Sequence, residues 1–171
     1  RRAMINTIIE DGAEVTQRFK KYSALVPIRE VGNVVYISGH GPENRNTYEP
    51  LFKGRVGVEL TVEQGYAAAR ECANTIFRDI VERYGSLDCI HHIVRAMALV
   101  NCGGDFDQPE KVMDGFSDFC VEVLEARGQH VRTVMGTHNM PNHQIPVEVE
   151  VIFVLNDAYR NKGEVTKDGT I

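Results

Sequence analysis

Hydrophobic positions recur along this chain with two different periods, which separate expected helices from expected strands. Thr61 and Gln64 have the spacing of a capping box, so a helix should begin directly after Thr61. Gly85 is a natural C-terminal stop for that helix. Between them the apolar residues return at helical spacing, as Val62, Tyr66, Ala69, Ala73, Ile76, Phe77 and Ile80.

A second helix is expected to begin near Pro109 and to end at Gly128. Its apolar stripe consists of Val112, Phe116, Phe119, Cys120, Val123 and Leu124. Four runs rich in β-branched residues predict strands, at residues 33–38, 93–100, 131–137 and 147–155. Residues 26–28 are a possible edge strand that pairs with the first of these through a turn at residues 31–33.

The predicted order is strands, helix, strand, helix and two strands, which indicates an α/β (α+β) two-layer sandwich in a single domain over residues 1–171. Residues 1–22 are taken as an N-terminal extension and residues 157–171 as a polar tail. The glycine-rich segment 39–57 is a long loop, and long loops in compact domains often carry function. Residues 140–143 form a predicted turn.

The last strand indicates assembly. Val147, Val149, Val151, Phe153 and Leu155 share one face, which suits packing under two helices, whereas Glu148, Glu150, Ile152 and Val154 share the other. Two helices cover only one side of a sheet, so the second apolar face would stay open. We therefore expect a homo-oligomer in which sheets pack together and sites lie between subunits.

Composition narrows the function classes. The 171 residues carry a net charge of −5, which argues against general nucleic-acid binding because phosphate contacts need a basic surface. No apolar run is long enough to cross a membrane, and the N-terminus lacks the apolar core of a signal peptide. The four cysteines form no C-x-x-C pair, which favours reduced thiols in a cytoplasmic protein.

Several polar residues could carry chemistry, each with a purely structural alternative. Arg132, on a largely apolar strand, could hold a carboxylate with two hydrogen bonds, or could be an ordinary ion-paired arginine. Glu148 or Glu150 could act as a general base or hold a water, or both could form a polar rim. The backbone of Ser38–Pro42 could receive an anion, or could be a simple glycine turn.

The sequence gives little support for a metal site or for a nucleophilic catalyst. His138 and His143 flank a turn, but no third ligand is evident, so we expect no metal. No G-x-S-x-G motif occurs, and Ser38 has no evident base.

Taken together in their order along the chain, the motifs are a more specific signal of family than any one of them. Residues 32–39 (GNVVYISG), then helix, strand and helix, then Arg132, Pro141 and residues 147–150 (VEVE) resemble the Rid family, the reactive intermediate deaminases, also called YjgF-like or L-PSP endoribonuclease-like proteins. Residues 57–70 (GVELTVEQGYAAAR) are similar to its longer-chain branch. The resemblance spans residues 24–156.

The resemblance implies a chorismate-mutase-like fold with a mixed sheet of about six strands and two main helices on one face. It also implies a homotrimer with active sites between subunits, and no cofactor. The implied reaction is hydrolysis of enamines and imines, such as 2-aminoacrylate, to 2-keto acids and ammonia. The implied substrate is a small molecule that carries a carboxylate.

Residue by residue, the resemblance makes Arg132 the carboxylate anchor and Glu148 the group that positions the attacking water. Ser38, Gly39 and Val134 match pocket positions, Val134 through its backbone. Two positions depart from the family pattern. Leu25 stands near a usual tyrosine, with Tyr22 three residues earlier, and Asp114 stands near a usual asparagine, where a carboxylate would repel an anionic substrate.

Two alternatives stay open, the first because of these departures and the second because of the historical endoribonuclease label of the family. One is a ligand-binding or interaction module of the same fold with little catalysis. The other is a single-stranded RNA endoribonuclease, for which His138 and His143 are the only candidate acid–base pair.

Overall fold

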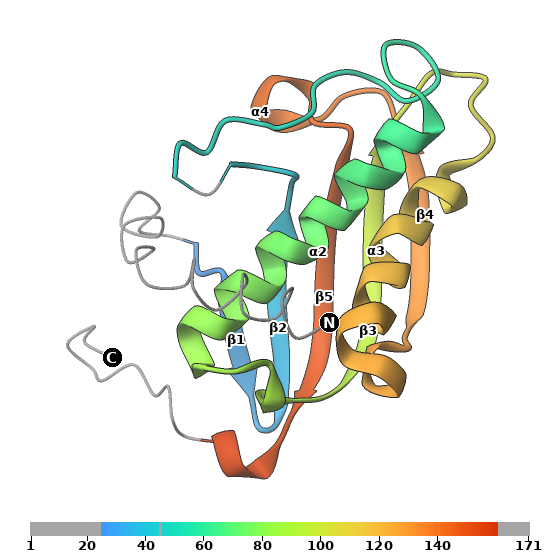
Figure 1. Ribbon diagram of the computed structural model, residues 1–171. Coiled ribbons are helices and arrows are strands. Elements are labelled where there is room, and N and C mark those ends of the chain that lie inside the picture. The colour runs from blue at the N-terminus through green and yellow to red at the C-terminus, as the bar shows by residue number, and fades with distance from the viewer. Residues whose placement is uncertain (1–24, 45, 161–171) are drawn as a thin grey trace.

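A five-stranded mixed sheet with two long helices on one face forms the body of the protein (Figure 1). The structure, a computed structural model, describes residues 25–44 and 46–160. The strands are β1 (Ile28–Val31), β2 (Val34–His40), β3 (Ile90–Asn101), β4 (Val131–Thr137) and β5 (Val147–Leu155). The long helices are α2 (Val62–Tyr84) and α3 (Pro109–Leu124). The expected α+β sandwich is confirmed, with five strands in the described residues where about six were expected.

The strand order is β1-β2-β5-β3-β4, so the last strand of the chain lies in the middle of the sheet. β3 and β4 are parallel and are joined through α3, whereas the other neighbours are antiparallel. The short elements are η3 (Leu87–Cys89), η4 (Glu125–Gly128), α4 (Pro141–Gln144) and η5 (Asp157–Tyr159). The turn predicted at residues 31–33 joins β1 to β2, and Gly32 in it has a positive φ of 65°.

Both ends of α2 follow the prediction. The Thr61 hydroxyl accepts a hydrogen bond from the Gln64 amide at 3.2 Å, and the Gln64 side chain accepts one from the Thr61 amide at 2.9 Å. Gly85 ends the helix with φ 78°.

The predicted end of α3 at Gly128 is wrong. The helix stops at Leu124, Glu125 takes a positive φ of 56°, and residues 125–128 form the 3₁₀ turn η4. Gly128 has a different role, because a Cβ there would overlap the backbone carbonyl of Cys120. A glycine at this position permits the close return of the chain onto α3.

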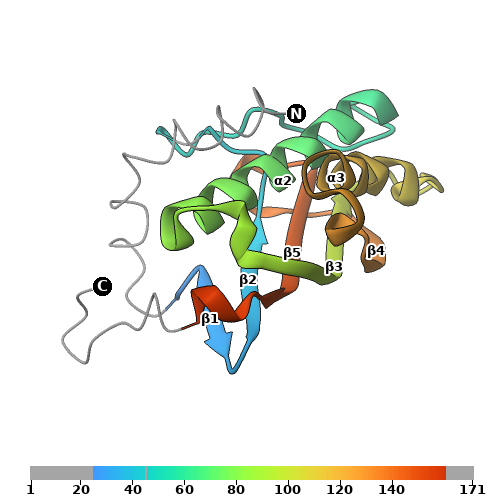
Figure 2. The same ribbon diagram turned by 60° about the horizontal axis from the view of Figure 1, so that its bottom comes forward.

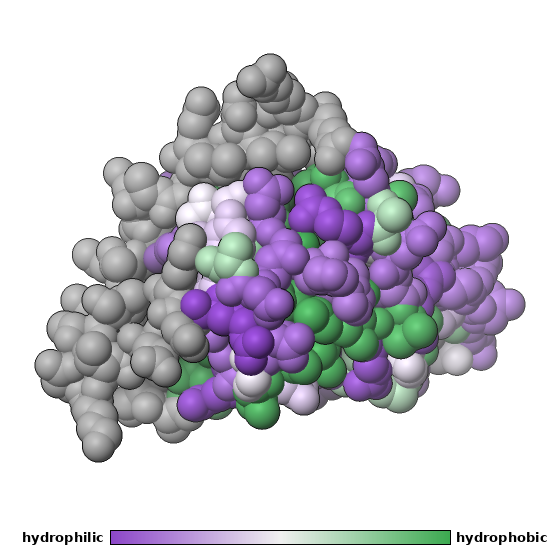
Figure 3. Space-filling model, turned by 90° about the horizontal axis from the view of Figure 1, so that it is seen from below, coloured by the Kyte–Doolittle hydropathy of each residue, from purple (hydrophilic) through white to green (hydrophobic). Residues whose placement is uncertain are grey.

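The alternation of β5 divides the sheet into a covered and an open face. Val147, Val149, Val151, Phe153 and Leu155 are buried under α2 and α3, as predicted, while Glu148, Glu150, Ile152 and Val154 lie on the other face. Figure 2 shows both helices on the same side of the strands. In Figure 3, green hydrophobic side chains are visible on the lower side of the molecule, which faces away from these helices.

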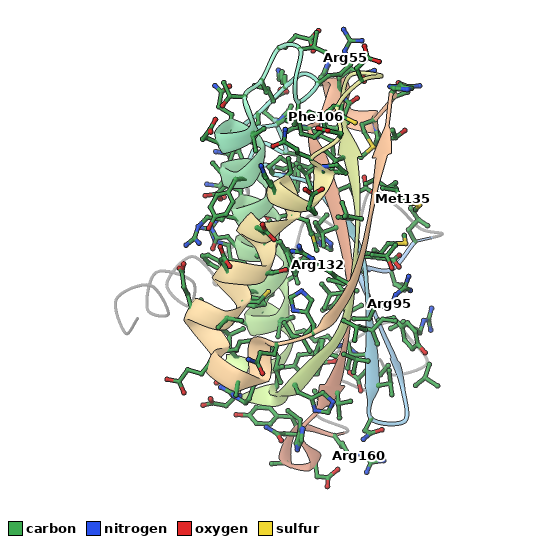
Figure 4. All side chains as sticks on the ribbon, turned by 90° about the vertical axis from the view of Figure 1, so that its right-hand side faces the viewer. Arg55, Arg95, Phe106, Arg132, Met135 and Arg160 are labelled. Carbon is green, nitrogen blue, oxygen red and sulfur yellow. The ribbon has the colours of Figure 1, made fainter. Side chains whose placement is uncertain are left out.

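The open face carries exposed hydrophobic residues, including Tyr36, Val131 and Met135. Figure 4 shows Met135 and Arg95 on this side of the sheet, opposite α3. No helix of the described chain covers it, which matches the expectation of an unpartnered apolar face.

The structure covers two of the expected segments only in part or not at all. The extension of residues 1–22, with Tyr22, lies outside the described residues. The expected polar tail begins with the ordered turn η5, and residues 161–171 lie outside the description. Across the described ranges, no helix combines the length and hydrophobicity that a membrane crossing requires.

Candidate functional site

Glu148 lines a pocket between the loop that follows β2 and the turn that precedes β5. We call it the Glu148 pocket; its volume is about 680 Å³. It is lined by Leu25, Gly39, Gly41, Glu43, Thr47, Tyr48, Glu49, Pro141, Asn142, Ile145 and Glu148. Three of these side chains are carboxylates and none is cationic, so the pocket favours a ligand with a positively charged or hydrogen-bond-donating group.

The Glu148 carboxylate is half-buried, and no described residue donates a hydrogen bond to it. Burial raises the pKa of Glu148, and the negative charges of Glu43 and Glu150 raise it further, whereas the charge of His40 lowers it. Gly39 lies directly against this carboxylate, because an added Cβ would overlap Glu148 Oε1. With no donor to them among residues 25–44 and 46–160, the acceptor sites of Glu148 can hold a water or a substrate proton.

A strained turn forms the rim of the Glu148 pocket. Asn142, His143 and Gln144 in α4 all have positive φ, at 47°, 61° and 63°. The Asn142 side chain donates hydrogen bonds to Glu43 Oε1 at 2.5 Å and to the Tyr48 carbonyl at 3.2 Å. Three consecutive left-handed residues that are not glycine cost free energy, and such strain is typical of ligand-binding loops.

Arg132 lies in a different place, on the helix side of the sheet at its β4 edge (Figure 4). Its guanidinium donates to Asp114 Oδ1 at 2.7 Å and to Ser117 Oγ at 3.0 Å, both on α3. The Arg132 side chain is 27 % exposed and that of Asp114 is 47 % exposed, so an arriving anion could reach this pair. We call Arg132, Asp114, Ser117 and His130 the Arg132 cluster.

His130 completes the Arg132 cluster. Its Nδ1 donates to the Gly128 carbonyl at 2.7 Å, and its Nε2 lies 3.1 Å from Ser117 Oγ. Burial and the charge of Arg132 lower the pKa of His130, whereas its bond to Gly128 raises it. Ser117 Oγ accepts from Arg132, so its hydroxyl hydrogen can be donated to His130 Nε2. Arg132, Ser117 and His130 thus form a chain of hydrogen bonds that orients the guanidinium.

The described chain does not bring Arg132 and Glu148 together. Arg132 pairs with Ala96, which is buried under the helices, whereas Glu148 pairs with Leu99 on the open face. Gly39 and Leu25 line the Glu148 pocket, and the Ser38 hydroxyl beside it donates to the Val26 carbonyl at 2.9 Å. Asp114 contacts Arg132, and Val134 lies two residues further along the same strand.

Sequence reasoning missed Ser117 and His130 of the Arg132 cluster. It also missed the contact between the buried side chains of His40 and Asp79, which lie 2.7 Å apart. One signal was available for Asp79, since it interrupts the apolar stripe of α2 between Ile76 and Ile80. Ser117 and His130 gave none, because their contact depends on how α3 packs on β4.

The other candidates for chemistry are the cysteines, His138 and a metal site. The four cysteines are buried free thiols, and burial raises the pKa of each, which makes them poor nucleophiles. His138 donates to the Cys102 carbonyl at 3.0 Å. Among residues 25–44 and 46–160, no group of three or more histidine, cysteine or acidic side chains could hold a metal ion.

Comparison with known proteins agrees with this fold. A family model described as "YjgF/chorismate mutase-like, putative endoribonuclease" matches residues 6–153. Protein TCP17 of Trypanosoma cruzi is 32% identical over 127 residues, which cover 74% of this chain and 78% of TCP17.

Two solved structures share the fold. That of Atu1372, a protein of unknown function from Agrobacterium tumefaciens, has a TM-score of 0.76 and 24% identity over 91% of this chain and 97% of its own. E. coli TdcF with bound serine has a TM-score of 0.54 and 18% identity over 76% of this chain and 87% of its own. By its family-model match and its sheet topology, this chain belongs to the YjgF/chorismate mutase-like family.

Proposed function

We propose that the protein is an enamine/imine deaminase that hydrolyses small 2-imino acids to 2-keto acids and ammonia. The observation that carries this proposal is the half-buried Glu148 carboxylate, whose acceptor sites no described residue uses, at the wall of an open pocket. Imine hydrolysis needs little beyond a positioned water and an oriented substrate, so no cofactor is required. The solved relative with bound serine supports a ligand of amino-acid size.

The reaction follows from these groups. An enamine such as 2-aminoacrylate tautomerises to the imine, and a water held by Glu148 adds to the imine carbon. Glu148 takes a proton from this water and returns it to the nitrogen. The carbinolamine then collapses, the C–N bond breaks, and ammonia and a 2-keto acid leave. Arg132 would hold the substrate carboxylate with two hydrogen bonds.

Arg132 and Glu148 lie on opposite faces of one sheet, so we propose that each site combines Arg132 of one copy with Glu148 of another. A homotrimer supplies three such pairs through one repeated contact. The apolar open face, with Tyr36, Val131 and Met135 exposed, supports such an assembly. The buried free thiols fit a cytoplasmic location.

The test couples the protein to a pyridoxal-phosphate serine or threonine dehydratase and follows keto-acid release. We expect wild type to accelerate keto-acid release. Arg132→Ala and Glu148→Gln should give no acceleration over the uncatalysed rate. Asp114→Asn, which removes the anion competing for Arg132, should lower the KM. Equal acceleration by wild type and Arg132→Ala would reject the deaminase.

Two other outcomes would support the alternatives. Binding of 2-keto acids without imine turnover indicates a ligand-binding module of the same fold. The family description also names endoribonuclease activity. Cleavage of single-stranded RNA that survives extensive purification, and is lost when His138 and His143 are both replaced, would favour that function.

A further inference from the structure

A buried ionic couple lies directly behind the Glu148 pocket. His40, the last residue of β2, and Asp79 of α2 are 3 % and 4 % exposed, and His40 Nε2 lies 2.7 Å from Asp79 Oδ2. Of the four buried polar side chains in the described residues, these two are the ionisable ones. A hydrophobic pair of similar volume would fill the same space without the cost of desolvation, so packing does not explain the couple.

The couple holds the backbone that touches Glu148. His40 Nδ1 donates to the Ser38 carbonyl at 2.6 Å, because a carbonyl oxygen only accepts. The imidazole is therefore fixed from both sides, by Ser38 and by Asp79. Between Ile37 and His40 the pairing of β2 with β5 shifts register, and Gly39 at this irregularity lies against the Glu148 carboxylate.

The couple also sets the charge next to Glu148. His40 pairs with Val149, the neighbour of Glu148 on β5. The other charged groups that act on Glu148 are carboxylates, Glu43 from the loop after β2 and Glu150 from β5 itself. Cys72, from α2, is a neutral thiol because burial and nearby carboxylates hold its pKa well above the usual value.

We propose that the His40–Asp79 couple is a positioning element for Glu148, which fixes the Ser38–Gly39 backbone and keeps an imidazolium charge on the inner side of the carboxylate. Both ring nitrogens of His40 face oxygens that accept, the Ser38 carbonyl and the Asp79 carboxylate, so both donate and the ring carries a positive charge. This charge opposes the repulsion from Glu43 and Glu150. Both His40 nitrogens have partners, so His40 acts through its charge and its hold on the backbone rather than by transferring protons. The inference rests on the proposed function for the importance of Glu148.

The first measurement uses wild-type protein. In ¹⁵N NMR spectra at neutral pH, both ring nitrogens of His40 should carry protons. A neutral His40 ring would overturn the proposal, and this readout needs neither a variant nor an activity.

The second measurement follows the titration of the Glu148 carboxyl by ¹³C NMR, with the signal assigned by its loss in Glu148→Gln. Asp79→Asn preserves the shape of Asp79 and removes the anion that His40 Nε2 contacts, so the midpoint of Glu148 should move to higher pH. Where Asp79→Asn does not fold, His40→Gln removes the same positive charge, and the same shift is expected.

Asp118→Asn is the matched control, because Asp118 lies on α3 and bonds Tyr66 at 2.8 Å, away from the pocket. It should leave the Glu148 midpoint unchanged. A folded Asp79→Asn protein with an unchanged midpoint would show that the couple is only structural. If the midpoint moves but no variant or wild type turns over imines, the proposed function fails while the coupling stands.

Discussion

Gly39 shows how strongly a single missing side chain determines the Glu148 pocket. A Cβ at this position would overlap Glu148 Oε1, so Gly39→Ala must displace the carboxylate. Since a displacement of about 1 Å in a catalytic group costs up to about 100-fold, we expect kcat/KM for imine hydrolysis to fall about 10- to 100-fold.

Gly104→Ala is the matched control for this substitution. A Cβ at Gly104 meets nothing closer than His138 Cε1 at 3.9 Å. It should keep its activity, and both variants should keep the far-ultraviolet circular dichroism of wild type. Full activity in Gly39→Ala would contradict the role given to Glu148.

The buried carboxylate of Glu148 also has a consequence for stability. Folding raises the pKa of Glu148, so its contribution to stability is complete at low pH and is lost as pH rises through the folded pKa. Glu148→Gln removes the ionised form and should raise the Tm near pH 7, with a smaller gain near pH 4.

Glu122→Gln should behave in the opposite way. Arg70 donates two hydrogen bonds to Glu122, and these hold the pKa of Glu122 below its usual value. This substitution should lower the Tm near pH 7, and the loss should shrink as acid protonates the wild-type carboxyl. Thermal denaturation at both pH values checks the pair. If Glu148→Gln and Glu122→Gln shifted the Tm near pH 7 in the same direction, the Tm would not report the ionisation of these carboxylates.

The packing of α3 against α2 depends on one close contact at Gly115. Gly115 of α3 faces the backbone of α2, where an added Cβ would overlap the Tyr66 carbonyl. Alanine normally stabilises a helix by about 1 kcal/mol relative to glycine. Gly115→Ala should instead destabilise the protein by about 1–3 kcal/mol, because α3 must move away from α2.

Chemical denaturation measures the change in unfolding free energy caused by Gly115→Ala. Carboxylate binding at Arg132 shows whether the change also affects the Arg132 cluster. Since α3 carries Asp114 and Ser117, we expect carboxylate binding to weaken as well. An unchanged or higher unfolding free energy would show that the helices can adjust at this contact.

Elements whose signal is periodic were predictable from the sequence. The stripe of α2, its capping box and the alternation of β5 each gave the observed element. The end of α3 was not, because Gly128 fits a helix stop equally well and its role depends on contact with Cys120. The sequence predicted a turn at residues 140–143 but not the left-handed conformation of residues 142–144, since asparagine, histidine and glutamine take many conformations.

At the scale of the whole molecule, the family resemblance named candidate residues but did not say on which face of the sheet each one lies. Gly39 and Glu148 do meet at one pocket, and Arg132 does meet Asp114. The face on which each side chain lies depends on the register of β4 against β3 and of β3 against β5. A one-residue change in register reverses a face, so motif order alone cannot give this placement.

The separation of Arg132 from Glu148 leads to a test of the assembled molecule. If each site takes Arg132 from one copy and Glu148 from the next, Arg132→Ala and Glu148→Gln proteins are each inactive alone. After joint refolding at equal amounts, about a quarter of the sites in a cyclic trimer combine an intact Arg132 with an intact Glu148. We therefore expect about a quarter of wild-type activity in the mixture, measured with the dehydratase-coupled assay. Mixing each variant with itself is the control, and a mixture that stays inactive although native mass spectrometry shows mixed trimers would place both groups of a site in one chain.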